Sequence, residues 1–187
     1  MKLRKRKIPI QRHRREIAKK TMQRDAKISD DGVYRYWLSR IWDDAKPKIL
    51  VIMLNPSTAD EVKDDDTICK LRNKVAAWGY GGMYVGNLYA YRTPYPKVLK
   101  TVSDPEGPEN RKYIRDMIDS GSFERVVYAW GNEEKEPQWL RELVREPYCI
   151  ALSKKGIPRH PGRLKNGLAL VKFRDQWLTY EVSMKPV

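Results

Sequence analysis

Short apolar runs recur along the middle of the chain, separated by polar and amphipathic stretches. Four of them have the length of strands: KILVIML (48–54), MYVGNLYAY (83–91), RVVYAWG (125–131) and YCIALS (148–153). The first and third are almost continuously apolar, which is typical of strands buried on both faces of a sheet. The pattern therefore predicts four strands in the interior of a sheet.

Apolar residues at helical spacing fill the gaps between these runs. They are Ile68, Leu71, Val75 and Trp78 in the first gap, Tyr113, Ile114, Met117 and Ile118 in the second, and Trp139, Leu140, Leu143 and Val144 in the third. Gly79 is a stop signal after the first helix, and Pro108 suits the first turn of the second. The third helix is expected over residues 137–145. Because strands alternate with helices, the sheet should be mainly parallel, with crossover connections.

Two flanking segments also have strand character. VYRYWLSRIWD (33–43) predicts a strand or edge strand, and LALVKFRDQWLTYEV (168–182) predicts one or two extra strands. The expected fold is therefore α/β, a three-layer sandwich with a central, mainly parallel four-stranded sheet plus peripheral strands. Residues 1–30 are interpreted as a basic N-terminal arm and residues 31–187 as a single α/β domain. A chain of 187 residues can bury a core without disulfides or metals.

Composition narrows the setting of this domain. Cys69 and Cys149 lie far apart without ligand spacing, so we expect packed thiols in a reducing compartment and a cytoplasmic location. No apolar run reaches the ~20 residues of a membrane span. The basic N-terminus lacks the apolar stretch of a secretory signal. We expect no membrane association and a monomer.

The net charge of +14 points to a partner. Much of it lies in MKLRKRKIPIQRHRREIAKK, where Glu16 is the only acid. Such an arm should attract nucleic acid, DNA above all, by releasing counterions from phosphates, and Lys5 and Arg6 are candidate DNA contacts. An anionic membrane is a weaker alternative because the arm has no clean apolar face. A tail that only aids solubility is the other alternative.

Polar segments follow each predicted strand. They are LNPSTAD, NLYAYRTP, WGN and GIPRHPGRL, in chain order. Ligands of open α/β sheets bind beyond the carboxyl ends of the strands, so these segments should share one rim. Asn55 either makes a chain reversal before Pro56 or holds a water molecule with its carbonyl oxygen. Asn87, inside an apolar strand, either satisfies the backbone or presents a donor and an acceptor to a nucleobase.

His160 lies between Pro158 and Pro161, in a loop that also carries Arg159 and Arg163. Because the prolines restrict the backbone, this loop is expected to position the imidazole for function.

The acidic cluster has three interpretations. Its members are Asp60, Glu61, Asp64, Asp65 and Asp66. Acids ahead of a helix cap it and complement its dipole. One Asp could instead act as a general base, or the group could bind a hard cation, although the D-x-D-x-D-G calcium pattern is absent.

Several common enzyme motifs are missing. The chain has no phosphate-binding P-loop, no G-x-S-x-G elbow, no H-E-x-x-H and no Cys/His zinc pattern. GYGGMYVG precedes a strand rather than a helix, so no dinucleotide site is expected. We expect no cofactor and no metal.

The motifs LNPSTAD…DD.T, GY.G…NL.AYR, AWG and G.PRHP, over residues 34–165, resemble those of a family of bacterial and phage proteins. Their order also resembles the uracil-DNA glycosylase superfamily. That resemblance implies that Asn55 orients the attacking water and that Asn87 reads a pyrimidine edge. It also implies that His160 stabilises the departing base, and that Arg163 and Leu164 wedge into the duplex.

Other roles are expected around these motifs. Asp60 or Asp64 would assist the water, Tyr89 would contact the base beside Asn87, and Arg92 and Arg159 would contact DNA. The chain departs from the glycosylase pattern where Met53 replaces a leading Gly, where the loop reads H-P-G-R-L, and where the cysteines of the iron–sulfur branches are absent. These departures suggest either a different target base or a changed chemistry.

The predicted function is hydrolysis of the N-glycosidic bond of an uncommon or modified base flipped out of DNA, in repair or in phage–host conflict. One alternative is a non-catalytic nucleic-acid-binding protein that reads modified bases. Another is a base- or nucleotide-modifying enzyme that uses the acidic cluster with a metal.

Overall fold

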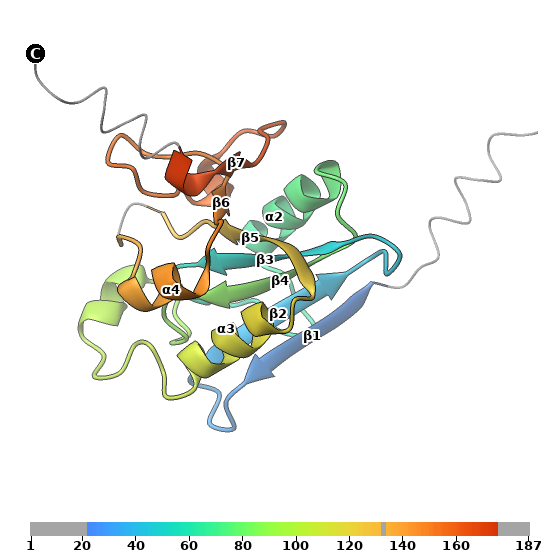
Figure 1. Cartoon of the computed structure of the whole chain (residues 1–187). Coiled ribbons are helices and arrows are strands. Elements are labelled where there is room, and N and C mark those ends of the chain that lie inside the picture. The colour runs from blue at the N-terminus through green and yellow to red at the C-terminus, as the bar shows by residue number, and fades with distance from the viewer. Residues whose placement is uncertain (1–21, 132–133, 176–187) are drawn as a thin grey trace, which may run out of the picture.

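The computed structural model describes residues 22–131 and 134–175. These residues form an α/β fold around one mixed sheet of seven strands, in the order β1-β2-β4-β3-β5-β6-β7 (Figure 1). The strands are β1 Gln23–Ile28, β2 Arg35–Ile41, β3 Lys48–Met53, β4 Gly82–Asn87, β5 Phe123–Tyr128, β6 Tyr148–Cys149 and β7 Val171–Lys172. The helices are α2 Asp66–Ala77, α3 Asn110–Asp119 and α4 Gln138–Leu143, with 3₁₀ turns η1 Pro96–Lys100 and η2 Pro161–Arg163.

Parallel and antiparallel pairing both occur in the sheet. Strand β3 pairs in parallel with β4 and β5, and β5 pairs in parallel with β6. The pairs β1–β2, β2–β4 and β6–β7 are antiparallel. The α/β class and the four apolar runs as strands are confirmed, but the sheet is a mixed one of seven strands.

The strand expected within residues 33–43 is confirmed as β2, and of the two alternatives it is an interior strand, because β1 covers it on the side away from β4. Residues 23–28, counted with the basic arm, form that edge strand instead. Their sequence QRDAKI contains few apolar residues, since an edge strand keeps much of its surface in water. Residues 1–21 lie outside the described part.

Alternation along β3 divides the core between the two faces of the sheet. Ile49 and Val51 join a buried cluster with Leu71 of α2. Leu50 and Ile52 join a second cluster with Ile114 of α3 and Leu140 of α4. Each buried aliphatic side chain stabilises the fold by about 1.5–3 kcal/mol. Helices therefore pack on both faces, and β3 is buried between them, as its continuous apolar run predicts.

Helix boundaries follow local signals. Helix α2 begins after Asp65, whose Oδ1 accepts a hydrogen bond from the Ile68 amide at 2.9 Å, and Gly79 follows its end at a φ of 92°. Pro108 stands just before α3 rather than in its first turn. Of the extra strands expected over 168–182, the structure shows β7, and residues beyond 175 lie outside the described part.

Cys69 and Cys149 are free thiols, as expected. Burial raises the pKa of the Cys149 thiol to about 12, which makes it a packing residue rather than a nucleophile. Among the described helices, none has the length and apolar character needed to cross a bilayer.

Candidate functional site

A cavity of about 360 Å³ opens at the carboxyl ends of β3 and β4. Its lining residues are Arg35, Met53, Leu54, Asn55, Ser57, Asp65, Thr67, Ile68, Asn87, Thr93, Pro94, Pro96, Trp130, Gly131, His160 and Arg163. They come from segments far apart in sequence, which the sheet brings to one rim. This is the position expected for a ligand site in such a fold.

Asn55, Asn87 and His160 line this same cavity. Asn55 follows β3, Asn87 ends β4, and His160 immediately precedes η2. The structure thus brings together the three residues that the sequence singled out from three separate motifs.

Asn87 has an unpaired side chain. The residue is 1% exposed, and among the described residues neither its Nδ2 nor its Oδ1 has a hydrogen-bond partner. Its backbone is satisfied independently, because its carbonyl oxygen accepts from Asn110 Nδ2 at 2.9 Å. A buried unpaired amide costs about 1–3 kcal/mol. Asn87 therefore does not serve the backbone, and it leaves a donor and an acceptor beside the cavity.

The amide of Asn55 has a fixed orientation. Its Nδ2 donates to the carbonyl oxygens of Pro56, at 3.0 Å, and Thr93, at 2.7 Å. The flipped amide would place its oxygen against two carbonyl oxygens, so the observed orientation is the favourable one. Asn55 Oδ1 is then the acceptor that remains for a ligand or a water molecule.

The imidazole of His160 is held as a neutral donor. Its Nδ1 accepts a hydrogen bond from the Gly162 amide at 3.2 Å, so the proton of the neutral ring is on Nε2. Burial lowers the pKa of His160, and the neighbouring Arg163 lowers it further. At neutral pH the side chain therefore offers an uncharged N–H.

Asp60 and Asp64 do not line the cavity. Asp60 Oδ1 accepts from the amides of Val62 and Lys63, at 2.9 and 2.7 Å, and these bonds lower its pKa. Asp60 therefore stabilises its own loop. The expectation that it acts on the cavity water is not supported by this position.

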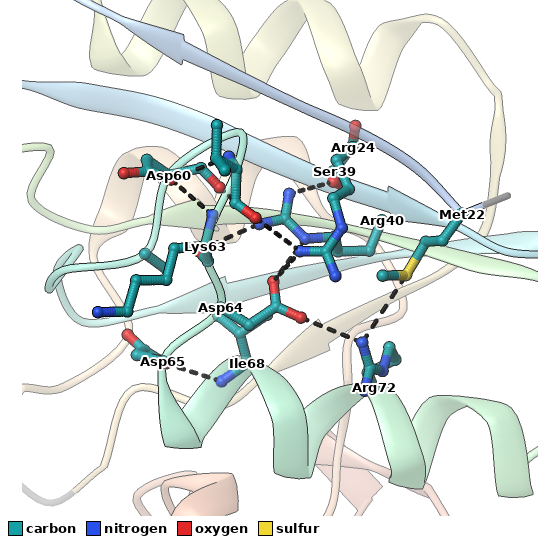
Figure 2. Close-up of polar contacts among 12 residues, drawn as sticks. Met22, Arg24, Ser39, Arg40, Asp60, Lys63, Asp64, Asp65, Ile68 and Arg72 are labelled. Carbon is teal, nitrogen blue, oxygen red and sulfur yellow. Dashed lines mark hydrogen bonds and ion pairs between the residues drawn. The ribbon is translucent and has the colours of Figure 1, made fainter.

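Asp64 is the centre of an arginine cluster (Figure 2). Its Oδ1 lies 2.6 Å from Arg40 Nε and 3.1 Å from Arg24 Nη1, and its Oδ2 lies 3.1 Å from Arg72 Nη1. Arg40 is fully buried, and it also donates to the carbonyl oxygen of Asp60. Asp64 is thus the counter-ion of a buried arginine, and arginine side chains engage both of its oxygens.

Asp65 is the acid of the cluster that reaches the cavity. Its Oδ1 caps α2, as the capping interpretation predicted for this cluster. Within the described residues, no group of three or more His, Cys, Asp or Glu side chains could hold a metal ion.

Arg35 is the cavity residue that the sequence did not indicate. It is 2% exposed, its Nη1 donates to the Ala59 carbonyl oxygen, and burial lowers its pKa to about 10. Simple alternation would place Arg35 on the face opposite Leu38 and Arg40. The register of β1 and β2 shifts at this point: Lys27 is opposite Trp37 but Ile28 is opposite Arg35. Such a bulge redirects a side chain.

The remaining expected contacts are dispersed. Arg163 is an exposed part of the cavity rim, and Arg159 is exposed outside it. Leu164 is half-buried, and its carbonyl oxygen accepts from Lys74. Arg92 is half-buried and donates to the Gly32 carbonyl at 3.0 Å, which makes it a loop tether. Lys5 and Arg6 lie outside the described residues.

Tyr89 lines a neighbouring cavity of about 420 Å³ rather than the one that contains Asn87. Strand alternation would place Tyr89, two residues after Asn87, on the same side as Asn87, but β4 ends at Asn87 and the alternation does not continue. Burial and the nearby Glu134 raise the pKa of Tyr89 to about 12. A direct contact between Tyr89 and a base on Asn87 is therefore not supported.

Trp130 forms an apolar wall of the main cavity. It is 1% exposed, and its Nε1 donates to the Glu134 carbonyl at 2.8 Å, so only its ring surface is offered to a ligand. Gly131 follows at a φ of 99°, which favours glycine, and a Cβ added at this position would lie 3.5 Å from the Cβ of His160. The AWG motif thus contributes the Trp130 ring to the cavity lining and a glycine turn next to His160.

Fold and site together define an α/β protein with a polar cavity at the carboxyl ends of its parallel strands. The chain belongs to the DUF1643 family, described as a protein of unknown function, whose family profile matches residues 35–162. That stretch runs from Arg35 of the cavity to just past His160. No curated protein and no solved structure matches the chain significantly.

Proposed function

We propose that this protein is a DNA glycosylase-like hydrolase that takes an uncommon or modified base, flipped out of DNA, into the main cavity. The observation that carries the proposal is the unpaired amide of Asn87, which lies in the cavity shared by Asn55 and His160. A base edge bearing one donor and one acceptor would satisfy both atoms of that amide.

Asn55 and His160 each have a geometry suited to a catalytic role. Asn55 Oδ1 accepts a hydrogen bond from water and holds it against C1′ of the sugar. The C1′–N bond breaks, its electron pair leaves with the base, and the neutral His160 donates Nε2–H to the negative charge that develops. Water supplies the hydroxyl group to the sugar and a proton to the base, so the reaction balances without a cofactor.

Cavity size and sheet pairing also support the proposal. A volume of about 360 Å³ lies within the range of small-molecule sites and suits a base better than a whole oligonucleotide. The parallel pairs β4–β3, β3–β5 and β5–β6 agree with the central four-stranded parallel sheet that the glycosylase resemblance implies. The charge of +14 supports DNA as the partner. We propose that the protein acts as a cytoplasmic monomer.

The test is base release. The full-length protein would be incubated with duplex and single-stranded DNA containing uracil, hydroxymethylated or hypermodified pyrimidines, and free base and alkali-labile sites would be measured. We expect release from one member of the panel, and a loss of about a hundredfold or more in Asn55→Ala and His160→Ala. Folded protein that binds DNA yet releases no base would reject the catalytic proposal.

The second candidate function is a reader that binds a modified base without cleaving it. It is favoured by one observation on Asp65, the carboxylate in the cavity lining. Its Oδ1 is already used to cap α2, so this carboxylate is less suited to act as a general base. A reader would keep the Asn87-dependent preference for modified DNA and release no base. Its DNA affinity would be unchanged in Asn55→Ala.

A further inference from the structure

Arg35 is a buried cation in the wall of the cavity. It is 2% exposed, and its Nη1 donates to the Ala59 carbonyl oxygen. Its Nε is buried without a partner. The carboxylates of Asp65 and Asp60 favour its charge from a distance, but no direct ion pair between Arg35 and a carboxylate is found among the described residues. A buried charge without a direct counter-ion is strongly unfavourable.

Arg40, on the same strand, shows how this protein otherwise buries a guanidinium. Arg40 is also fully buried, but its Nε lies 2.6 Å from Asp64 Oδ1. Its other nitrogens donate to the carbonyl oxygens of Ser39 and Asp60. Arg40 is therefore satisfied by the protein, whereas Arg35 lines a cavity and is satisfied only in part.

The other charged groups around the cavity do not cancel the positive charge of Arg35. The rim residue Arg163 adds a second guanidinium, while Asp65 is the single carboxylate in the lining. The pKa of His160 is lowered, so its ring is neutral at pH 7. The lining therefore carries a net positive charge beside the donor and acceptor of Asn87.

We infer that the ligand of this cavity carries an anionic group that Arg35 binds, next to the polar edge that pairs with Asn87. The inference rests on the proposed function in one respect, that the ligand is a nucleobase or nucleotide. The anion is then either a carboxylate substituent on the base or the phosphate of the nucleotide. Both match a guanidinium through charge-assisted hydrogen bonds.

The experiment measures binding of free ligands to the full-length protein by titration calorimetry. The probes are uracil, uracil-5-carboxylate and deoxyuridine 5′-monophosphate. We expect at least one anionic probe to bind about tenfold or more tightly than neutral uracil, and that preference to weaken with salt. The two anionic probes distinguish a base carboxylate from a phosphate. Equal affinity for all three probes, or no binding of either anion, would overturn the inference.

Variants connect the preference to Arg35. Arg35→Gln should bind the anionic probe only as well as uracil, Asn87→Ala should weaken both, and Arg115→Gln, an exposed arginine of α3 outside the cavity, should change neither. A preference that persists in folded Arg35→Gln would overturn the inference. If Arg35→Gln does not fold, Arg35→Lys replaces it, and an unchanged preference with an unchanged salt dependence in that variant counts against a bidentate guanidinium contact.

Failure of this inference is distinguishable from failure of the proposed function. Binding of a free anionic ligand requires no bond cleavage, so an Arg35-dependent preference without base release keeps the inference and rejects the catalytic proposal. Release of neutral uracil from DNA without any anion preference does the reverse.

Discussion

The ammonium group of Lys74 lies 2.7 Å from the carbonyl oxygen of Lys165. It also donates to the Leu164 carbonyl at 3.0 Å and to Asn166 Oδ1 at 3.1 Å, so its three protons are paired. The residue is only 5% exposed, and this burial lowers the pKa of Lys74, with a smaller contribution from the charge of Lys70. Helix α2 thus fixes the segment that directly follows His160 and η2.

Replacing Lys74 by Met should loosen this segment. The side chain keeps its length, but two partly buried hydrogen bonds to carbonyl oxygens are lost, and we expect the free energy of unfolding to fall by about 1–3 kcal/mol. Ligand affinity and base release should fall as well, because the His160 loop loses its anchor. Urea unfolding and calorimetry measure the two effects. Lys70→Met, an exposed lysine of the same helix, is the control, and equal behaviour of both variants would contradict the anchoring role.

Asn87 and Asn110 are a matched pair of buried amides with opposite expectations. Asn110 Nδ2 donates to the carbonyl oxygens of Asn87 and Leu88, whereas the Asn87 side chain is unpaired. We expect Asn110→Leu to destabilise by about 2 kcal/mol or more, and Asn87→Leu to be neutral or stabilising by about 1 kcal/mol. Asn87→Leu should nevertheless abolish ligand binding. Chemical denaturation with the binding assay checks both, and marked destabilisation by Asn87→Leu would indicate a structural amide.

The lowered pKa of His160 gives stability a defined pH dependence. The unfolded chain binds a proton near 6.5, while the folded protein resists protonation because of burial and Arg163. The stabilising contribution is therefore complete above pH 6.5 and is lost as the pH falls through the lower folded pKa. Thermal unfolding of wild type and His160→Gln between about pH 5 and 8 measures this difference. His13 is present in both proteins and cancels. Identical pH profiles would contradict the prediction.

Hydrophobic pattern was enough to predict the interior strands, the helices and the meeting of Asn55, Asn87 and His160. All three predictions depend on local periodicity and on the rule that parallel strands share a carboxyl edge. The run at residues 48–54 is almost continuously apolar because both faces of β3 are buried. Strand β1 could not be predicted in the same way, because its edge position removes the apolar signal.

The errors in the site have a different origin. Arg35 reaches the cavity through a register shift between β1 and β2, which depends on the pairing of two strands and not on spacing within either. Asp64 and Asp65 are neighbours in the sequence, but Asp64 pairs with Arg40 whereas Asp65 lines the cavity. Which acid of a run turns inward is decided by the loop that precedes α2. That loop is held by arginines on another strand, so composition alone assigns no roles.

Asp64 should matter for stability and not for a metal. Asp64→Ala leaves the fully buried Arg40 without its counter-ion, and removal of one member of a buried pair typically costs about 3–5 kcal/mol. Thermal and urea unfolding would measure the loss, with the exposed Glu61→Ala as control. Magnesium or manganese should not raise the melting temperature of wild type. A metal-dependent rise that disappears in Asp64→Ala would instead support the metal-using enzyme.

The basic arm should hold DNA without selecting the base. Replacing Lys5 and Arg6 by Ala removes two cations, so the plot of log affinity against log salt should become shallower by about 0.9 for each phosphate that is no longer neutralised. Affinity should fall equally for modified and unmodified duplexes, because phosphate contacts carry no sequence information. Base release at saturating DNA should be unchanged, since no residue of the cavity is altered.

Fluorescence anisotropy at several salt concentrations gives the slope. Lys112→Ala is the control, because that ammonium already pairs with Asp116 at 2.8 Å. An unchanged slope would remove the arm from the DNA interface and leave its charge as an aid to solubility.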